Sequence, residues 1–202
     1  MTLMNFQIGI KQLMTIKKNC KKEKSNYGGI MFIKRKNKIN NEIEAKTNAE
    51  KLRELGANVG EGCEIFDGTK FESEPYLITI GNNVRITEGV TFLNHDGGVW
   101  TLRKMGLLED ADIFGQIKVG DNVHIGMNAT ICPGVTIGNN CIIGVGSIVT
   151  KDVPDNTVVA GIPARKIETI EEYYQKHKDT CDFTKHMSPE EKKTYLYKKY
   201  NL

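Results

Sequence analysis

The 202-residue sequence has no long hydrophobic run, and this absence sets the first limits on its class. No segment approaches the roughly 20 consecutive apolar residues that a membrane-spanning helix needs. The first residues also lack the apolar block and the small-residue cleavage site of a signal peptide. We therefore expect a cytoplasmic protein that has one domain with a real core, together with appendages.

Cysteine is scarce and its spacing carries no metal signature. The five cysteines form no CxxC pair and no zinc-ligand pattern, and their odd number does not suit a disulfide framework. Two of them, Cys63 and Cys141, stand where a repeat described below requires a small residue. We interpret both as free thiols packed as small apolar groups, and we expect no metal.

Aromatic residues are few, and the three in residues 1–46, Phe6, Tyr27 and Phe32, do not alternate with the basic residues there. Residues 1–46 hold eleven Lys or Arg against three Glu, so the rest of the chain has 17 basic and 22 acidic residues. Without interleaved aromatics this basic extension does not resemble a single-strand binder, and we expect no nucleic-acid partner. Weak contact with an anionic membrane surface and simple solvation both remain open for this weakly structured extension.

What the sequence does contain is a repeat of six residues. Between Val119 and Pro154 the hexapeptides VGDNVH, IGMNAT, ICPGVT, IGNNCI, IGVGSI and VTKDVP follow one another without a gap. A period of six fits neither an amphipathic helix nor an alternating strand. It predicts an all-β solenoid in which three short parallel faces close a coil of about 18 residues. The opening aliphatic residue points inward, while Gly or Asn takes the tight corner.

The repeat extends over residues 59–167, with two interruptions. Shorter runs begin at Val59 and Ile80, and the stretch FESEPYLIT between them is three residues longer than one unit. A longer segment, residues 96–112, is extruded as a loop before Ile113 resumes the phase of the repeat. Long loops in compact folds are often functional.

Helical segments are expected on either side of the solenoid. Thr47 and Glu50 have the spacing of a capping box, which predicts a short capping helix within residues 47–58. Residues 168–202 show helical patterns from about 168 to 178 and from 189 to about 199. We expect this C-terminal helical segment to cover the open end of the solenoid, whose strand edges would otherwise be exposed.

His95 is the first candidate for chemistry, because it stands where the solenoid releases the extruded loop. An imidazole titrates near neutral pH and can accept a proton from a hydroxyl or an amine. Position alone leaves two alternatives, a catalytic base and a solvated loop residue. The loop also holds the single Trp of the chain, Trp100, beside Arg103 and Lys104. This group is either a lid over a ligand or a contact with a neighbouring subunit.

Three motifs carry a family resemblance: GSIVTKDVP, AGIPAR and the histidine at the loop. With the uninterrupted repeat, they make the stretch from Val59 to Ile167 resemble the hexapeptide-repeat acyltransferases. These include galactoside, maltose and streptogramin acetyltransferases and the O-acetyltransferases of surface polysaccharides. The resemblance implies a left-handed parallel β-helix with a protruding loop, and a homotrimer with active sites between subunits. It also implies acetyl-CoA as cosubstrate and no metal.

The resemblance also assigns roles to residues. His95 falls on the catalytic histidine of the family, a general base in direct transfer without an acyl-enzyme. Glu74, Asn94 and Asp96 compete to orient His95, and Glu74, Tyr76 or Trp100 would meet the acceptor. The CoA groove would be lined by Met127, Val145, Thr150, Lys151 and Arg165, and the two cations among these suit the negative charges of CoA.

The predicted activity is acetylation of a hydroxyl group on a sugar or on a precursor of a capsular or other surface polysaccharide. Within the same chemistry, the alternatives are N-acetylation of an amino sugar or nucleotide sugar, and acetylation of an antibiotic. Two alternatives come from other classes. A γ-type carbonic anhydrase needs three imidazoles around zinc, whereas the repeats hold only His95 and His124. A non-catalytic β-helix scaffold is the other.

Overall fold

A computed structural model describes residues 46–202, so nearly all of the predicted basic extension lies outside the described residues. The core of the described part is a set of twelve short strands. Each has two or three residues: β1 (Asn58–Val59), β2 (Glu64–Ile65), β3 (Lys70–Phe71), β4 (Ile78–Ile80), β5 (Arg85–Ile86), β6 (Thr91–Phe92), β7 (Ile117–Val119), β8 (His124–Ile125), β9 (Thr130–Ile131), β10 (Thr136–Ile137), β11 (Ile142–Ile143) and β12 (Ile148–Val149).

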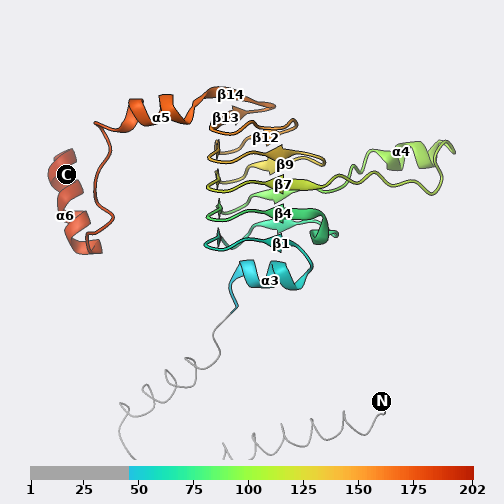
Figure 1. The fold of residues 1–202 in the computed structure, drawn as a ribbon, viewed down its shortest axis with the longest axis horizontal. Coiled ribbons are helices and arrows are strands. Elements are labelled where there is room, and N and C mark those ends of the chain that lie inside the picture. The colour runs from blue at the N-terminus through green and yellow to red at the C-terminus, as the bar shows by residue number, and fades with distance from the viewer. Residues whose placement is uncertain (1–45) are drawn as a thin grey trace, which may run out of the picture. The chain divides into compact units, whose positions relative to one another are not determined.

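Successive strands are distributed among three sheets in strict rotation. One sheet has the order β1-β4-β7-β10, the second runs β2-β5-β8-β11, and the third is β3-β6-β9-β12. All pairings among these strands are parallel. The chain therefore winds as a three-faced coil whose levels stack like rungs (Figure 1).

The pairing register measures the length of each coil. His124 pairs with Ile142, 18 positions later, which confirms the regular coil predicted from the hexapeptides. Asn58 pairs with Thr79, 21 positions later, so the first coil has three extra residues. Arg85 pairs with His124, 39 positions later, because the extruded loop lies in between. Both interruptions predicted from the sequence are therefore present.

Aliphatic residues fill the inside of the coil, one column for each face. The largest fully buried side chains include Phe92, Ile86, Ile125, Ile131 and Ile143. The Phe71 and Phe92 rings stack at 5.1 Å between centroids. Burial of this apolar surface, at about 25 cal/mol for each Å², is the main favourable term in the folding of such a coil.

Asparagine and aspartate side chains hold one corner together from level to level. Asn82 donates its backbone N–H to Asp121, whose own N–H is donated to the Asn139 side chain, at 2.6 and 2.8 Å. Asn139 donates in turn to Asp155 at 2.7 Å. The next residue at this corner, such as Asn122 or Asn140, has a positive φ, a conformation that asparagine tolerates better than most residues.

The first level is covered by helix α3 (Asn48–Glu54). Thr47 and Glu50 form the expected capping box, and Ala49 and Leu52 are buried against the coil. A short 3₁₀ helix, η1 (Pro75–Leu77), takes up the longer first corner. Within residues 46–202, no helix has the length and apolar character needed to cross a membrane.

The last level ends in a hairpin that the sequence did not predict. Strand β13 (Thr157–Gly161) joins the second sheet beside β11, and β14 (Ala164–Thr169) pairs with it antiparallel. Residues 168 and 169 were predicted to begin a helix, but they belong to β14. This strand pairs with β13 and covers its open edge.

The C-terminal helices do not both cover the coil as expected. Helix α5 (Ile170–His177) contacts β13 and β14. None of the residues of α6 (Pro189–Tyr200) is buried. Helix α6 is instead joined to the segment before it, where Lys199 forms an ion pair with Asp182 at 2.6 Å.

The extruded loop is longer than its predicted bounds, residues 96–112. Ile113 is 46% exposed and lies at the base of the loop rather than inside the coil. The coil resumes with the buried residues Ile117 and Val119 in β7. The prediction for Ile113 was wrong because an aliphatic residue in phase with the repeat can also face outward at a corner. The loop carries a helix of its own, α4 (Val99–Lys104), which protrudes from the coil (Figure 1).

We predict that Ile125→Ala lowers the free energy of unfolding by about 2–5 kcal/mol, because the lost side chain leaves a cavity in the buried column. Urea unfolding at one fixed protein concentration measures the change. The control Ile167→Ala removes a side chain that is 59% exposed and should change stability by less than about 0.5 kcal/mol. Equal effects of the two substitutions would contradict a coil stabilised from within.

Candidate active site

The base of the extruded loop is a short antiparallel ladder. Asp96 donates its N–H to the carbonyl of Ile113 at 2.8 Å, and Gly115 donates to the carbonyl of Asn94 at 2.9 Å. His95 stands opposite Phe114 in this ladder. The backbone around His95 is therefore fixed by the coil below it and by the returning arm of the loop.

A cleft of about 220 Å³ opens at this base. It lies between the first long corner, which follows β3, and the loop, which follows the neighbouring strand β6. Its lining comes from these two segments: Ser73, Glu74, His95, Asp96, Gly97, Val99, Arg103, Asp112, Ile113 and Phe114. The two interruptions of the repeat thus meet in one place and form one site.

His95 has two oxygen atoms near its Nδ1 and an aromatic ring at its edge. Nδ1 lies 3.4 Å from Oδ1 of Asn94 and 3.8 Å from Oε2 of Glu74. The ring of Phe114 approaches edge-on, at 6.4 Å between centroids. The His95 side chain is 38% exposed, whereas that of Glu74 is only 18% exposed. The imidazole is therefore accessible from the cleft, while Asn94 and Glu74 contact it at Nδ1.

Asn94 fixes which His95 nitrogen carries the proton. Asn94 is fully buried, and its Nδ2 donates to the backbone carbonyl of Glu74 at 2.7 Å. Because a carbonyl can only accept, the amide nitrogen must face Glu74, and the amide oxygen is left facing His95. Both this oxygen and the Glu74 carboxylate accept hydrogen bonds, so they favour a proton on Nδ1. The lone pair of a neutral His95 then lies on Nε2.

Asp96, the third candidate for orienting His95, is engaged elsewhere. Its Oδ1 accepts the backbone N–H of Gly98 at 2.8 Å, within the turn that leads into α4. Asp96 nevertheless lines the cleft. The geometry therefore places Glu74 and Asn94 at the imidazole, and Asp96 elsewhere in the lining of the cleft.

Tyr76 and Trp100 do not line the cleft. Tyr76 is 64% exposed and lies beside Gly56 at the end of α3. Trp100 is 56% exposed on α4, where the Lys104 ammonium lies 5.8 Å from the centre of its ring. In this chain neither side chain reaches the cleft that contains His95.

Sequence reasoning assigned no role in the site to Asp112 or Phe114, and it named Arg103 only as part of a lid over a ligand or of a contact with a neighbouring subunit. Arg103 donates from NH1 to Asp112 Oδ1 at 2.7 Å and to the carbonyl of Ala111 at 2.5 Å, which ties α4 to the returning arm of the loop. Phe114 reaches His95 through the antiparallel ladder. The hexapeptide period contains no signal for such a pairing, because the ladder lies outside the repeat.

The residues expected to bind CoA divide into two ridges. Met127 and Val145 lie at the corner before the third sheet, one level apart, since Gly146 donates its N–H to the carbonyl of Met127. Arg165 lies one strand beyond the next level, in β14, where it pairs with Ala160 of β13. Thr150 and Lys151 follow β12, at the other end of the strands of the third sheet. All five are exposed.

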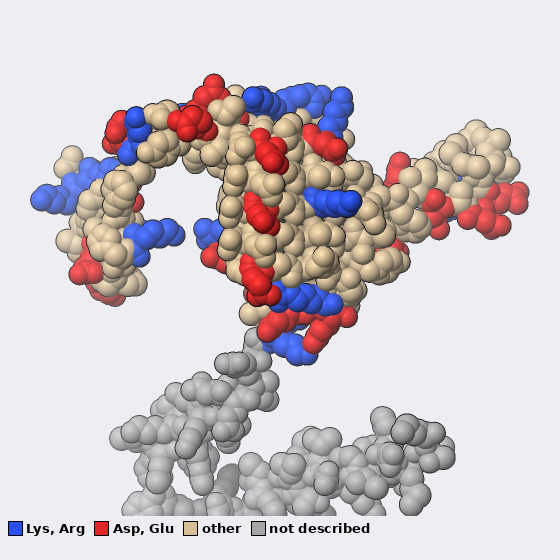
Figure 2. Space-filling model, viewed as in Figure 1, with Lys and Arg blue, Asp and Glu red and all other residues tan. Residues whose placement is uncertain are grey.

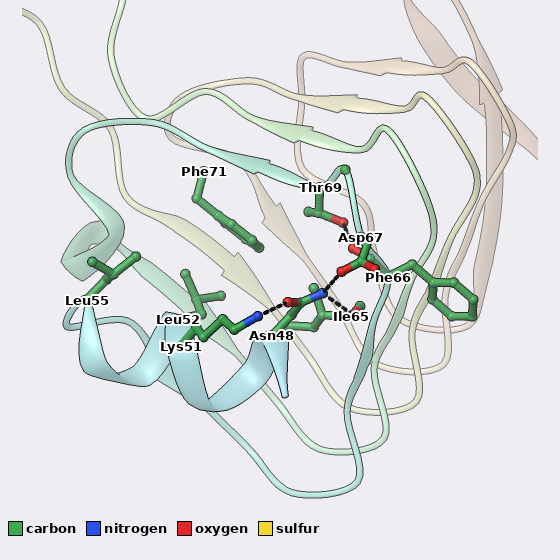
Figure 3. A pocket seen from close by; sticks show the side chains of 10 residues that line it. Asn48, Lys51, Leu52, Leu55, Ile65, Phe66, Asp67, Thr69 and Phe71 are labelled. Carbon is green, nitrogen blue, oxygen red and sulfur yellow. Dashed lines mark hydrogen bonds between the residues drawn. The ribbon is translucent and has the colours of Figure 1, made fainter. Parts of the chain in front are cut away.

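A second hollow of about 160 Å³ lies between α3 and the first coil (Figure 3). Leu52, Leu55 and Phe71 supply its apolar wall. Its polar groups satisfy one another: the Asn48 amide donates to the Ile65 carbonyl and to Asp67, and Lys51 donates to Asn48 (Figure 3). This hollow belongs to the seal between helix and coil, and we assign it no chemistry.

The two histidines of the repeats lie on different sheets. His124 is in β8 of the second sheet, whereas His95 follows β6 of the third. Among residues 46–202, no group of three or more His, Cys, Asp or Glu side chains has the arrangement of a metal site. His124 instead lies beside Arg85 across the strand pair.

Comparison with known proteins places the chain in a family. The family model described as bacterial transferase hexapeptide (six repeats) matches residues 116–151. Protein CapG of Staphylococcus aureus is 52% identical over 153 residues, which are 75% of this chain and 88% of CapG. Galactoside O-acetyltransferase of Escherichia coli K12 is 38% identical over 144 residues, 59% of this chain and 66% of the enzyme.

A solved structure agrees with this result. A hexapeptide-repeat containing acetyltransferase of Vibrio cholerae, complexed with acetyl coenzyme A, superposes with a TM-score of 0.51 at 26% identity. The alignment covers 62% of this chain and 79% of that one. Coil, loop and relatives together define a transferase built on parallel hexapeptide coils. The chain belongs to the bacterial hexapeptide-repeat transferases and is an acyltransferase, which confirms the resemblance found in its motifs.

His124 gives a prediction about pH and stability. Burial, and next the positive charge of Arg85, lower the pKa of His124 below its ordinary value of 6.5. The unfolded chain therefore takes up a proton on this residue at a higher pH than the folded chain, and stability falls as the pH drops below about 6.5. His124→Gln should lose less unfolding free energy between pH 7.5 and 5.5 than the wild type. Equal losses in urea titrations would refute the assignment.

Proposed function

We propose that this protein transfers an acetyl group from acetyl-CoA to a hydroxyl of a sugar or of a surface-polysaccharide precursor. The observation that carries the proposal is His95, whose tautomer is set by Asn94 and whose ring faces a cleft lined by carboxylates and Phe114. The name of the Escherichia coli relative, a galactoside O-acetyltransferase, supports the acceptor class.

In the proposed reaction His95 acts as general base. Its Nε2 takes the proton of the acceptor hydroxyl while the oxygen attacks the thioester carbonyl, so no acyl-enzyme forms. The C–S bond then breaks, the acetyl group stays on the acceptor oxygen, and CoA leaves as a thiolate that receives the proton from His95. Acetyl-CoA supplies only the activated acetyl group. The protein supplies the base and its orientation.

Glu74 and Asn94 are positioning residues in this scheme. When His95 accepts the proton, the imidazolium has an N–H at Nδ1 directed at the Asn94 oxygen and at the Glu74 carboxylate. A negative charge at this distance stabilises the imidazolium more than the neutral ring. Asn94 also donates a hydrogen bond to the backbone carbonyl of Glu74, which holds the Glu74 segment beside His95.

Acetyl-CoA fits the exposed cations near the end of the coil. Figure 2 shows Lys and Arg gathered over the β13–β14 end, and Arg165 is among the exposed residues there. Lys151 and Arg165 would hold phosphates. Met127, Val145 and Thr150 would contact the pantetheine arm. Since these residues lie on two ridges at opposite ends of the β12 strand, we infer a site completed by a second copy of the chain.

The assembly we propose is a homotrimer of left-handed coils with one site at each junction between subunits. The family resemblance supports both the handedness and the trimer. The division of the CoA residues between two ridges supports a shared site, because one ridge of each copy would face the other ridge of its neighbour.

N-acetylation of an amino sugar is the second candidate. The carboxylates of Glu74 and Asp96 in the cleft would attract its ammonium group. Mass spectrometry of the product, before and after mild alkaline removal of O-acetyl groups, separates the two reactions. The scaffold alternative is tested by the first substitution below.

His95→Ala should reduce turnover by about 10²–10⁴-fold, because the general base is lost while the cleft remains. Release of CoA thiol from acetyl-CoA, measured with a panel of sugars and oligosaccharides, gives the rate. The matched control is His124→Gln at pH 7.5, which changes a histidine on another sheet of the same solenoid. Full activity of the His95 variant would overturn the proposed function.

Glu74→Gln should lower kcat by about tenfold or more and leave the KM for acetyl-CoA unchanged, because the substitution removes the charge that stabilises the imidazolium. Glu72→Gln removes a carboxylate from the same corner outside the cleft lining, and serves as the control. A purely structural role of Glu74 would instead alter the thermal stability and KM together. That pattern would count against positioning through His95.

A further inference from the structure

The charges around the cleft are strongly biased toward one sign. Of the residues that line it, three carry carboxylates, Glu74, Asp96 and Asp112, and one carries a cation, Arg103. His95 is the remaining titratable group. The cleft therefore presents more negative than positive charge to whatever enters it.

The single cation of the lining is paired with one of the lining carboxylates. Arg103 donates from NH1 to the Asp112 carboxylate at 2.7 Å and to the carbonyl of Ala111 at 2.5 Å. The two charges of this pair largely offset each other. Arg103 therefore links α4 to the returning arm of the loop, and Asp112 balances its charge locally.

Neither Glu74 nor Asp96 forms an ion pair with a Lys or Arg among the described residues. Glu74 accepts the hydroxyl hydrogen of Ser73 at 2.7 Å and faces His95, with no cation paired to it among the described residues. Asp96 uses one oxygen for the N–H of Gly98 and has a second oxygen for a substrate hydroxyl. Two carboxylates that have no Lys or Arg partner among the described residues thus line the cleft together with the imidazole that takes the proton.

An acceptor bound for reaction must bring a hydroxyl to His95, and its ring then lies beside these carboxylates. A carboxylate, phosphate or sulfate on that ring would come within several ångströms of Asp96 and Glu74. Like charges at such distances near a protein surface repel strongly enough to lower binding by about tenfold or more. A neutral ring meets no such penalty, and Phe114, 53% exposed, gives it an apolar surface.

We propose that this cleft selects acceptors that have no negative charge on the reacting ring, and that Asp96 is a main determinant of this selection. The inference rests on the proposed function and adds the charge class of its acceptor. The acceptor and acetyl-CoA would then meet charges of opposite sign, because the cations proposed for the CoA phosphates, Lys151 and Arg165, do not line the acidic cleft.

The test compares methyl galactoside with its 6-carboxylate and 3-sulfate derivatives. Two anions at different positions are used so that the loss of one hydroxyl cannot explain both results. The wild type should use each anionic sugar with a kcat/KM at least about tenfold below that of the neutral sugar. Asp96→Asn keeps the hydrogen bond to Gly98. It should reduce, several-fold, the ratio of kcat/KM for the neutral sugar to kcat/KM for each anionic sugar. Asp110→Asn, on the same loop and outside the cleft lining, should leave them unchanged.

The inference is overturned if the wild type uses neutral and anionic sugars equally, or if Asp96→Asn leaves the ratios as they were. Failure of the proposed function gives a different result, namely no transfer even to methyl galactoside. Charge selection is then read from binding, as protection of His95 against diethyl pyrocarbonate, followed by mass spectrometry. Stronger protection by the neutral sugar than by the anionic sugars supports the inference, and equal protection overturns it.

Discussion

The structure depends on one constraint, the parallel hydrogen bonding of each coil to the next. His124 donates its N–H to Cys141, and Gly126 donates to Ile143, one level up. Since the aliphatic columns inside must stay aligned, every level has to return to the same register after three faces. Residues that do not fit a level cannot remain in a strand and are extruded at a corner.

That constraint explains how a rigid coil acquires a cleft. Both insertions leave at the same corner, one after β3 and one after β6, and these strands are direct neighbours. The two loops therefore stack on each other. Asn94, buried between them, satisfies a carbonyl of the lower loop and directs its oxygen at the imidazole of the upper one. A buried amide of this kind is costly unless fully hydrogen-bonded, so it couples the site to the fold.

The coil could be predicted from the sequence because its period is local, whereas the site could be predicted only in part. Sequence reasoning named His95, Glu74, Asn94 and Asp96 from the position of the interruptions and from the family motifs, and the structure brings these four residues together at the base of the loop. Phe114 and the pairing of Arg103 with Asp112 were missed, since both depend on the two ends of the loop folding back on each other. Ile113 was placed wrongly for the same reason. Strand β14 was missed because it lies at the edge of a sheet, outside the hexapeptide repeat, where the sequence has no periodic pattern.

The distribution of charge follows from the same architecture. Corners are the exposed part of each level, so charged residues can stand there without disturbing the interior. The corners that follow β3 and β6 bring acidic side chains to His95, while the last levels carry Lys151 and Arg165. The proposed binding of acetyl-CoA is consistent with this division: the phosphates would be attracted to the end of the coil, and only the uncharged thioester would have to enter the acidic cleft. In the proposed reaction the reacting ring of the acceptor has no such freedom, because its hydroxyl must reach His95, and the charge of that ring is therefore the property that the cleft would select.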